Sequence, residues 1–187
     1  MKRLLDFLFA AILLLILSPL LLLSALAIKL SSPGPIFFRQ RRVGRGMRPF
    51  DILKLRTMTV DPNRQLSQTQ GGDPEVTGPG RILRRLKIDE MPQLINVLNG
   101  DMALVGPRPC MAVTAEEAPD WAKKRFDVRP GLTGLAQVNG NIALSWEERF
   151  RHDVRYVEQR NLFMDIGIIF KTIAVVLVGE EKMKGAS

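Results

Sequence analysis

An uncharged run from Phe7 to Ile28 constrains this chain more than any other feature of its sequence. An apolar stretch of about 20 residues is long enough to cross a hydrocarbon core of about 30 Å as one helix. Ser18-Pro19 lies in the middle of the run, where a proline removes a backbone hydrogen bond and kinks a helix. The serine hydroxyl can satisfy the carbonyl that the proline frees. The run therefore predicts a bent membrane segment.

Three interpretations of this segment compete. It could be a cleaved signal peptide, with Ala25-Leu26-Ala27 resembling a cleavage site, or a single-pass anchor, or a helix that enters the membrane and turns back. Basic residues flank both ends of the run, and the positive-inside rule then places both ends on the cytoplasmic side, which favours the re-entrant helix. These residues are Lys2 and Arg3 before the run, and Lys29, Arg39, Arg41, Arg42, Arg45 and Arg48 after it.

The composition of the chain points to an anionic environment. Lys and Arg total 27 against 19 Asp and Glu, a net charge of +8. Such a balance suits nucleic acid, or an anionic membrane surface with phosphate-bearing ligands. Aromatic residues make up only 6%, without the basic-aromatic interleaving that base stacking uses. We therefore expect no nucleic acid partner. Anionic phospholipids of the inner leaflet are expected instead, and the alternative to an enzyme is a non-catalytic, membrane-bound basic module that gathers anionic lipids or nucleic acid.

The scarcity of cysteine and histidine limits the kinds of metal site that this chain can form. Cys110 is the only cysteine and His152 the only histidine, so the chain has no intrachain disulfide and no Cys/His zinc pattern. A metal in this protein must be held by carboxylates and phosphates. This donor set points to Mg²⁺ or Mn²⁺.

The rest of the chain predicts an α-rich α+β fold. Residues 36–43 and 48–55 form a short β-hairpin around Gly44-Arg45-Gly46, and Asp61 to Gly80 reads as a long polar loop. A helix over 91–98 ends at Asn99-Gly100. Alternating βαβ patterns are absent, which excludes a doubly wound nucleotide-binding domain.

The C-terminal half predicts turns and amphipathic helices that lie on the membrane face. The predicted segments are a rigid turn at 105–109, a loop at 129–134, a short helix at 121–128, a capping box at Ser145, and a helix at 162–178. That last helix could lie in the core or at the membrane interface, and its apolar character favours the interface. Residues 1–30 are then the re-entrant membrane anchor. Residues 31–187 form one cytoplasmic catalytic domain.

Asp89-Glu90 is the leading candidate for catalysis. Pro92 fits only the first turn of a helix, which places the two carboxylates at or just before its N-terminus. Such a pair can be a mere helix cap. A carboxylate among guanidinium groups can instead attack phosphorus, act as a general base in one ternary-complex step, or hold a divalent ion. The nearby cations that make this a phosphate site are Arg81, Arg84, Arg85, Lys87 and Arg108.

Several motifs together resemble the bacterial sugar transferase family, the small monotopic phosphoglycosyl transferases, over nearly the whole chain. They include Ser18-Pro19, residues 32–38, 40–44 and 54–58, Asp89-Glu90-Met91-Pro92-Gln93-Leu94, residues 100–109, Arg129-Pro130-Gly131-Leu132-Thr133-Gly134 and Gln137-Val138-Asn139-Gly140. Asn141-Ile142 stands where the family often has Arg-Asn, so the resemblance names no sugar.

The resemblance implies a function and roles for residues. Asp89 would attack the β-phosphate of a UDP-sugar, release UMP and carry the sugar phosphate as a covalent intermediate. Polyprenyl (undecaprenyl) phosphate would then take the sugar phosphate, in the first membrane step of a surface glycan or glycoprotein pathway. Glu90 would bind Mg²⁺. Binding of phosphate is implied for Arg108, with Arg84, Arg129, Lys54 and Arg56 as supporting residues beside Thr133. The catalytic domain would lie on the cytoplasmic face of the bacterial inner membrane, where other pathway glycosyltransferases are possible partners.

Overall fold

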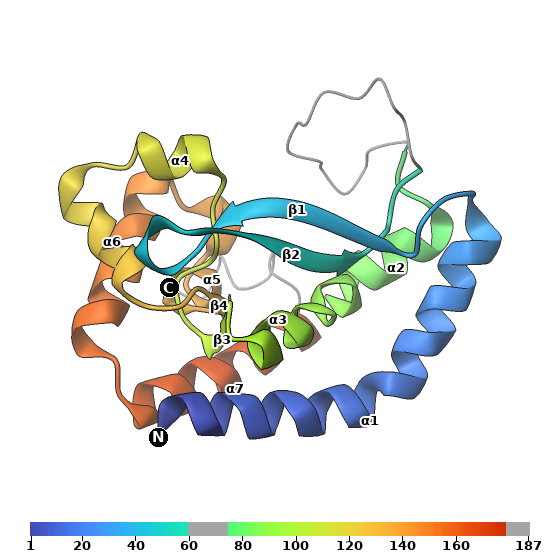
Figure 1. The fold of residues 1–187 in the computed structure, drawn as a ribbon, viewed down its shortest axis with the longest axis horizontal. Coiled ribbons are helices and arrows are strands. Elements are labelled where there is room, and N and C mark those ends of the chain that lie inside the picture. Colours follow the sequence, from blue (N-terminus) through green and yellow to red (C-terminus); the bar gives the residue numbers. More distant parts are fainter. Residues whose placement is uncertain (60–74, 179–187) are drawn as a thin grey trace.

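The computed structural model describes residues 1–59 and 75–178. The described chain is rich in helix, with a long apolar helix at its N-terminus and an antiparallel two-stranded hairpin on the other side of the molecule (Figure 1). Helix α3 lies between them. This arrangement confirms the predicted helix-rich fold with a short β-hairpin.

The hairpin has the predicted bounds to within a residue. Strand β1 (Phe37–Val43) pairs with β2 (Pro49–Leu55), with Phe37 opposite Leu55 and Val43 opposite Pro49. A single 3₁₀ turn, η1 (Arg45–Met47), joins them. Gly46 adopts φ 63°, a left-handed conformation that glycine takes at no steric cost.

Helix α1 (Lys2–Ser31) contains Pro19 in its interior. Residue 19 has no N–H to offer to the carbonyl of Leu15, and the Ser18 hydroxyl donates to that oxygen at 2.8 Å instead. The predicted serine compensation is thus confirmed. Within the described residues, α1 is the one helix long and apolar enough to cross a membrane, and 11% of its most apolar window is buried.

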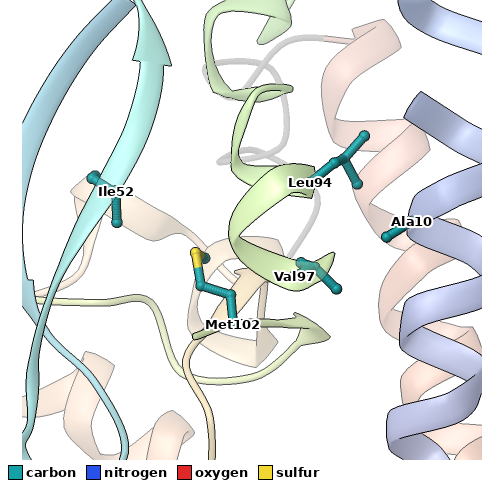
Figure 2. Packing of buried hydrophobic residues seen from close by; sticks show 5 residues of the cluster. All are labelled: Ala10, Ile52, Leu94, Val97 and Met102. Atoms are coloured by element: carbon teal, nitrogen blue, oxygen red, sulfur yellow. The ribbon is translucent and has the colours of Figure 1, made fainter. Parts of the chain in front are cut away.

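Both halves of α1 pack against the same folded body. In the first half, Ala10 faces Leu94 and Val97 of α3 (Gln93–Asn99), next to Ile52 and Met102 (Figure 2). In Figure 1 the helix continues past α2 towards the hairpin, and there Ile28 packs in a separate cluster of buried side chains. The other buried members of that cluster are Leu55 and Leu83.

The end of the loop predicted at 61–80 is helical in the structure. Helix α2 (Gly78–Arg85) begins inside the predicted loop because the Thr77 side chain accepts a hydrogen bond from the Gly80 N–H and Pro79 fits the first turn. The remainder of that predicted loop falls mainly on residues 60–74, outside the described residues. At its far end α3 stops as predicted, with Gly100 at φ 93°.

A second pair of strands was not predicted. Strand β3 (Ala103–Val105) pairs in parallel with β4 (Gly131–Thr133), so the prediction that 129–134 is only a loop was wrong. The pairing continues beyond the strands, because the Gly106 N–H donates to the Thr133 oxygen and the Ala103 N–H to the Pro130 oxygen. Three-residue strands are too short to leave an alternating pattern in a sequence.

The remaining elements are short helices followed by two longer ones. The Ser145 capping box at the start of α6 is present as predicted, and the apolar segment after it is helical as predicted. The predicted helix near 121–128 is a 3₁₀ helix. The elements are α4 (Ala112–Glu116), η3 (Asp120–Asp127), α5 (Leu135–Val138), η4 (Asn141–Ala143), α6 (Trp146–Gln159) and α7 (Leu162–Val178).

Candidate active site

The carboxylate pair lies where the sequence predicted it, directly before α3. Asp89 and Glu90 belong to a single 3₁₀ turn, η2 (Ile88–Glu90), which follows Lys87 in a left-handed conformation. Their exposed fractions are only 8% and 9%. Two adjacent acidic side chains buried together need compensating cations, since burial penalises the charged form.

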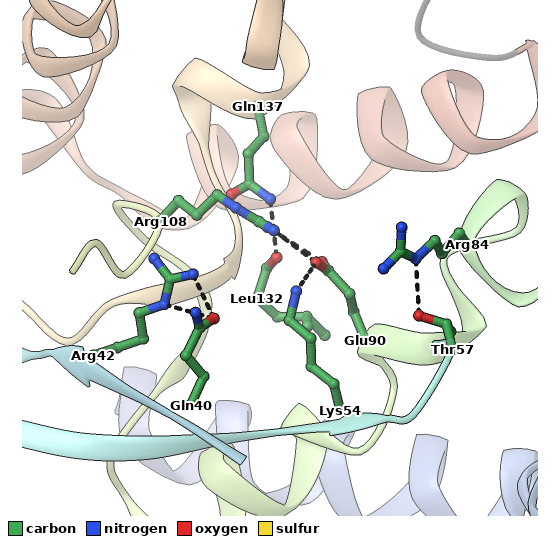
Figure 3. Close-up of polar contacts among 9 residues, drawn as sticks. All are labelled: Gln40, Arg42, Lys54, Thr57, Arg84, Glu90, Arg108, Leu132 and Gln137. Carbon is green, nitrogen blue, oxygen red and sulfur yellow. Dashed lines mark hydrogen bonds and ion pairs between the residues drawn. The ribbon is translucent and has the colours of Figure 1, made fainter. Parts of the chain in front are cut away.

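Glu90 receives its compensation from two directions (Figure 3). Its Oε1 accepts hydrogen bonds from Lys54 Nζ at 2.7 Å and Arg108 Nη2 at 2.6 Å, and its Oε2 accepts one from Arg108 Nη1 at 3.2 Å. Lys54 comes from β2 and Arg108 from the proline-bounded turn after β3. Burial opposes ionisation of Glu90, but these two cations outweigh it and hold its pKa well below the usual value.

Asp89 has a different environment. Its carboxylate accepts no hydrogen bond from any described residue, although the positive charges of Lys54, Lys87 and Arg84 act on it. Burial, and next the charge of Glu90, raise the pKa of Asp89 above its ordinary value. The pair is therefore asymmetric, since Glu90 accepts hydrogen bonds on both carboxylate oxygens and Asp89 accepts none within residues 1–59 and 75–178.

Arg84 and Arg108 lie on opposite sides of Glu90 in Figure 3. Arg84 is on α2, and its Nε donates to the Thr57 hydroxyl at 2.8 Å, directly after β2 (Figure 3). The structure thus brings together five of the candidate residues, which are Asp89, Glu90, Lys54, Arg84 and Arg108. Guanidinium and ammonium groups beside buried carboxylates are groups whose chemistry suits the binding of phosphate oxygens.

A buried ion pair supports Arg108. Arg125 of η3 donates from Nη2 to the backbone oxygen of Arg108 at 2.7 Å, and the same nitrogen lies 2.8 Å from Asp153 Oδ2. Its Nη1 lies 2.9 Å from the sulfur of the buried Cys110. Burial outweighs the attraction of Arg125 and raises the pKa of Asp153 to about 6. Sequence reasoning missed Arg125 and Asp153, which are separated in the chain and belong to no motif.

Two further residues near Arg108 were missed as site candidates. Arg42 of β1 donates twice to Gln40 Oε1, at 3.2 and 2.6 Å, and burial and then the charge of Arg108 lower its pKa. Gln137 of α5 lies beside Arg108 in Figure 3; its Nε2 donates to the Leu132 oxygen, while its buried Oε1 has no partner among the described residues. Both lie in motifs that the sequence displays, at 40–44 and 137–140.

Three predicted phosphate-binding residues lie elsewhere. Arg56 is buried and donates to the carbonyls of Pro33 and Ser32, at 2.6 and 2.7 Å, at the end of α1. Arg129 donates from Nε to the Gly100 oxygen at 2.7 Å, at the opposite end of α3 from Glu90. Thr133 shares a 2.7 Å hydroxyl contact with Thr172 of α7. The structure does not bring these three together with the carboxylate pair.

The two carboxylates could take part in binding a divalent cation. The described residues contain no cluster of three or more His, Cys, Asp or Glu side chains, so a cage made by the protein alone is not formed there. Mg²⁺ commonly uses one or two carboxylates and takes its other ligands from water and substrate phosphates. Asp89 and Glu90 fit that mode of binding.

Comparison with known proteins places this site in a family. The family model described as bacterial sugar transferase matches residues 1–179. The chain belongs to the bacterial sugar transferase family. This match covers α1, the hairpin, the carboxylate pair and the helices that follow. This bacterial sugar transferase is thus a phosphoglycosyl transferase, as the sequence motifs predicted.

Curated relatives agree with this assignment. The chain is 48% identical to the UDP-glucose:undecaprenyl-phosphate glucose-1-phosphate transferase of Caulobacter vibrioides, over 94% of this chain and 69% of that protein. It is 41% identical to the uncharacterized sugar transferase EpsL of Bacillus subtilis, over 96% and 89%. It is 42% identical to an N-acetylgalactosaminephosphotransferase of Aeromonas hydrophila, named for UDP-N-acetylgalactosamine and undecaprenyl phosphate, over 95% of this bacterial sugar transferase and 44% of the longer relative.

Proposed function

We propose that this enzyme transfers a sugar 1-phosphate from a UDP-sugar to undecaprenyl phosphate, releasing UMP and forming an undecaprenyl-diphosphate sugar. The observation that carries the proposal is the asymmetry of the carboxylate pair. Glu90 is bonded by Lys54 and Arg108, whereas Asp89 is buried beside it with no hydrogen-bond donor among the described residues. A desolvated carboxylate flanked by cations is suited to attack a phosphorus atom that carries negative oxygens.

The proposed reaction has two displacements at one phosphorus. An Asp89 oxygen bonds to the β-phosphorus of the UDP-sugar, the bond from that phosphorus to the bridging oxygen breaks, and UMP leaves with the electron pair. The sugar phosphate is then an acyl phosphate on Asp89. A phosphate oxygen of the lipid attacks the same phosphorus, and the Asp89 carboxylate leaves. Arg108 and Arg84 would neutralise charge on the phosphoryl oxygens.

Mg²⁺ or Mn²⁺ is part of the proposal. The bound cation would neutralise the diphosphate oxygens, with Glu90 as its carboxylate ligand. Lys54 and Arg108, which both contact Glu90, lower the pKa of its carboxyl group. Glu90 therefore stays ionised, which is the form that a metal ligand requires.

The nucleophile role is tested by trapping. Asp89→Asn keeps the shape of the side chain and removes its negative charge, so we expect no UMP release above background and no labelled sugar phosphate on the protein. The wild-type enzyme, incubated with labelled UDP-sugar without lipid acceptor, should carry one label that hydroxylamine removes. Release of UMP only when both substrates are present, with no labelled protein, would favour Asp89 as a general base instead.

The choice of sugar needs a direct assay. The relatives are named for glucose and for N-acetylgalactosamine, so their names alone do not fix the donor of this enzyme. Asn141 and Ile142 lie in η4, and the Ile142 side chain is 73% exposed. A panel of UDP-hexoses and UDP-N-acetylhexosamines, scored by UMP release, would identify the donor.

We also propose that α1 is re-entrant, with the catalytic domain on the cytoplasmic face of the inner membrane. A straight 30-residue helix is about 45 Å long, which would separate its ends by more than a bilayer core. Both ends of α1 instead bond to the same domain. Lys2 Nζ lies 2.6 Å from Asp165 of α7, and the Ser32 carbonyl accepts from Arg56.

Exposed apolar side chains support contact with a membrane. Within α7, Phe163 and Leu177 are 85% and 80% exposed, and Leu22 and Leu30 of α1 are 71% and 79% exposed. Such surface is costly in water and indicates an interaction site. We propose that these faces of α1 and α7 lie in one leaflet.

Topology can be tested by cysteine labelling in a Cys110→Ser background. A maleimide that cannot cross membranes should fail to label Lys2→Cys from the periplasmic side and should label it in inverted vesicles. Arg48→Cys, on the hairpin, is the matched control, because both topologies place it in the cytoplasm. Labelling of Lys2→Cys but not of Arg48→Cys from the periplasmic side would exclude the re-entrant helix. That result would not bear on the transfer chemistry.

A further inference from the structure

A polar cavity lies at the opposite end of α3 from the carboxylate pair. Its volume is about 150 Å³. A water molecule takes about 30 Å³ in the liquid and pockets for drug-sized ligands start near about 300 Å³, so this cavity suits a small hydrated anion and not a nucleotide sugar. Five cationic side chains line it, and they are Lys2, Arg3, Arg45, Arg129 and Arg160.

Two of these arginines are fixed by the backbone of α3. Arg3 donates to the carbonyl oxygens of Val97 and Leu98, and Arg129 Nε donates to the carbonyl of Gly100. These bonds satisfy carbonyls that the end of a helix leaves open. They leave the two terminal nitrogens of Arg129 without a partner among the described residues. Arg129 therefore presents donors to the cavity in a fixed position.

Two other arginines, Arg45 and Arg160, add positive charge to the lining of the cavity. Arg45 comes from the turn of the hairpin and Arg160 from the end of α6, and neither guanidinium group forms a hydrogen bond or an ion pair with any described residue. The acidic lining residues are Asp6 and Asp127, and Asp6 is already 3.5 Å from Lys2 Nζ. The cavity therefore keeps an excess of positive charge, carried mainly by guanidinium groups, whose fork geometry matches phosphate oxygens.

We propose that this cavity is a second phosphate-binding site, separate from the catalytic carboxylates. Its ligand is a phosphate group, either of a small soluble ion or ester or of an anionic lipid headgroup. The neighbouring surface of α1 allows the lipid source, because Leu4 and Phe7 are 63% and 43% exposed on the helix that supplies Lys2 and Arg3. The site needs neither Asp89 nor a donor sugar, so it stands independently of the transfer reaction.

The test compares charge removal inside and outside the cavity. Arg45→Gln with Arg160→Gln removes two cavity guanidinium groups that bond to no described residue. Arg48→Gln with Arg155→Gln removes the same charge from the hairpin turn and α6 at positions that do not line the cavity. Equal circular dichroism and equal melting without phosphate would establish that both double variants are folded.

Binding is then measured on the full chain with two probes. Inorganic phosphate is titrated by calorimetry against protein in neutral detergent, and phosphatidylglycerol is compared with phosphatidylcholine in nanodiscs by the shift in melting temperature. We expect the cavity variant to bind the probe at least roughly tenfold more weakly than the wild type, and the control variant to bind it as the wild type does. Binding of free phosphate identifies a soluble ligand, and an effect of phosphatidylglycerol alone identifies a headgroup. No response to either probe, or equal losses in the two variants, would overturn the proposal.

Discussion

Arg125 donates a hydrogen bond to the backbone oxygen of Arg108 across 2.7 Å, and this contact links the interior of the domain to the cations that contact Glu90. Arg108 in turn donates to both oxygens of Glu90. The Arg125 guanidinium is itself held by Asp153, and both side chains are at most 4% exposed. The position of the Glu90 carboxylate therefore depends on a pair of residues that touch neither carboxylate.

Removing one member of this pair should impair both stability and catalysis. Asp153→Ala leaves the buried Arg125 charge uncompensated, which costs about 3–5 kcal/mol when a buried ion pair is broken from one side. The folded fraction should also show a lower kcat for UMP release, because Arg108 loses its support. Thermal unfolding and steady-state kinetics at low temperature separate the two effects. Lys124→Ala, which breaks an exposed ion pair with Glu158, is the control, and we expect little change. Loss of stability with full kcat in Asp153→Ala would contradict the positioning role.

The same residue predicts a dependence of stability on pH. The pKa of Asp153 is about 6 in the folded protein against an ordinary value of 3.8, so between these values the folded state binds more protons than the unfolded state. This group therefore favours folding most at low pH, and its contribution is lost as the pH rises from about 4 through about 6. The change approaches about 1.4 kcal/mol per pH unit. Because Glu90, whose pKa is lowered, acts in the opposite sense, the measurement is the difference in unfolding free energy between wild type and Asp153→Asn across this range.

Lys54 should set the acid limb of the pH–rate profile. Its charge lowers the pKa of both Asp89 and Glu90, so Lys54→Met should raise both and move the acid limb to higher pH. Loss of this cation should also lower kcat/KM by roughly 10²–10³. Arg41→Met serves as the control, since Arg41 lies on β1 and pairs with the exposed Asp51. An unchanged acid limb in Lys54→Met would show that neither carboxylate titrates in the rate-limiting step.

Close approach of two glycines predicts a steric effect. A Cβ atom on Gly131 would lie 2.1 Å from the Gly106 nitrogen and 2.3 Å from the Thr133 oxygen, which are both backbone atoms. Gly131→Ala should therefore separate β3 from β4 and lower the unfolding free energy by about 3 kcal/mol or more. Gly167→Ala, in α7 where a Cβ meets nothing within 4 Å, should be neutral or stabilising by up to about 1 kcal/mol. Equal melting temperatures for the two variants would be inconsistent with this packing.

Local sequence chemistry was sufficient for much of the fold. The hairpin, the end of α3 at Gly100 and the capping box of α6 each depend on a few neighbouring residues with strong conformational preferences. The position of Asp89-Glu90 followed from Pro92 alone. The parallel β3–β4 pair could not be predicted in this way, because its partners are three-residue strands brought together by the tertiary fold.

The sequence likewise predicted only some of the residues that surround the carboxylate pair. Lys54, Arg84 and Arg108 were predicted from motifs, and they converge on the carboxylate pair. Arg56 and Arg129 have the same charge and equally distinctive motifs, yet they bond to backbone carbonyls at the ends of α1 and α3. A guanidinium group suits a carbonyl oxygen as well as a phosphate oxygen, so charge and motif alone do not separate the two uses.

The packing of α1 has a consequence for how the enzyme can be handled and how it matures. Ala10 and Ile28 belong to two different buried clusters, so helix α1 contributes side chains to the hydrophobic core of the domain. Cutting the chain after Ser31 would uncover Leu94, Val97 and Leu83 to water instead of liberating a soluble enzyme. The part of the chain after Ser31 cannot complete its native interior without its first helix, so the placement of α1 and the folding of the rest of the protein are coupled.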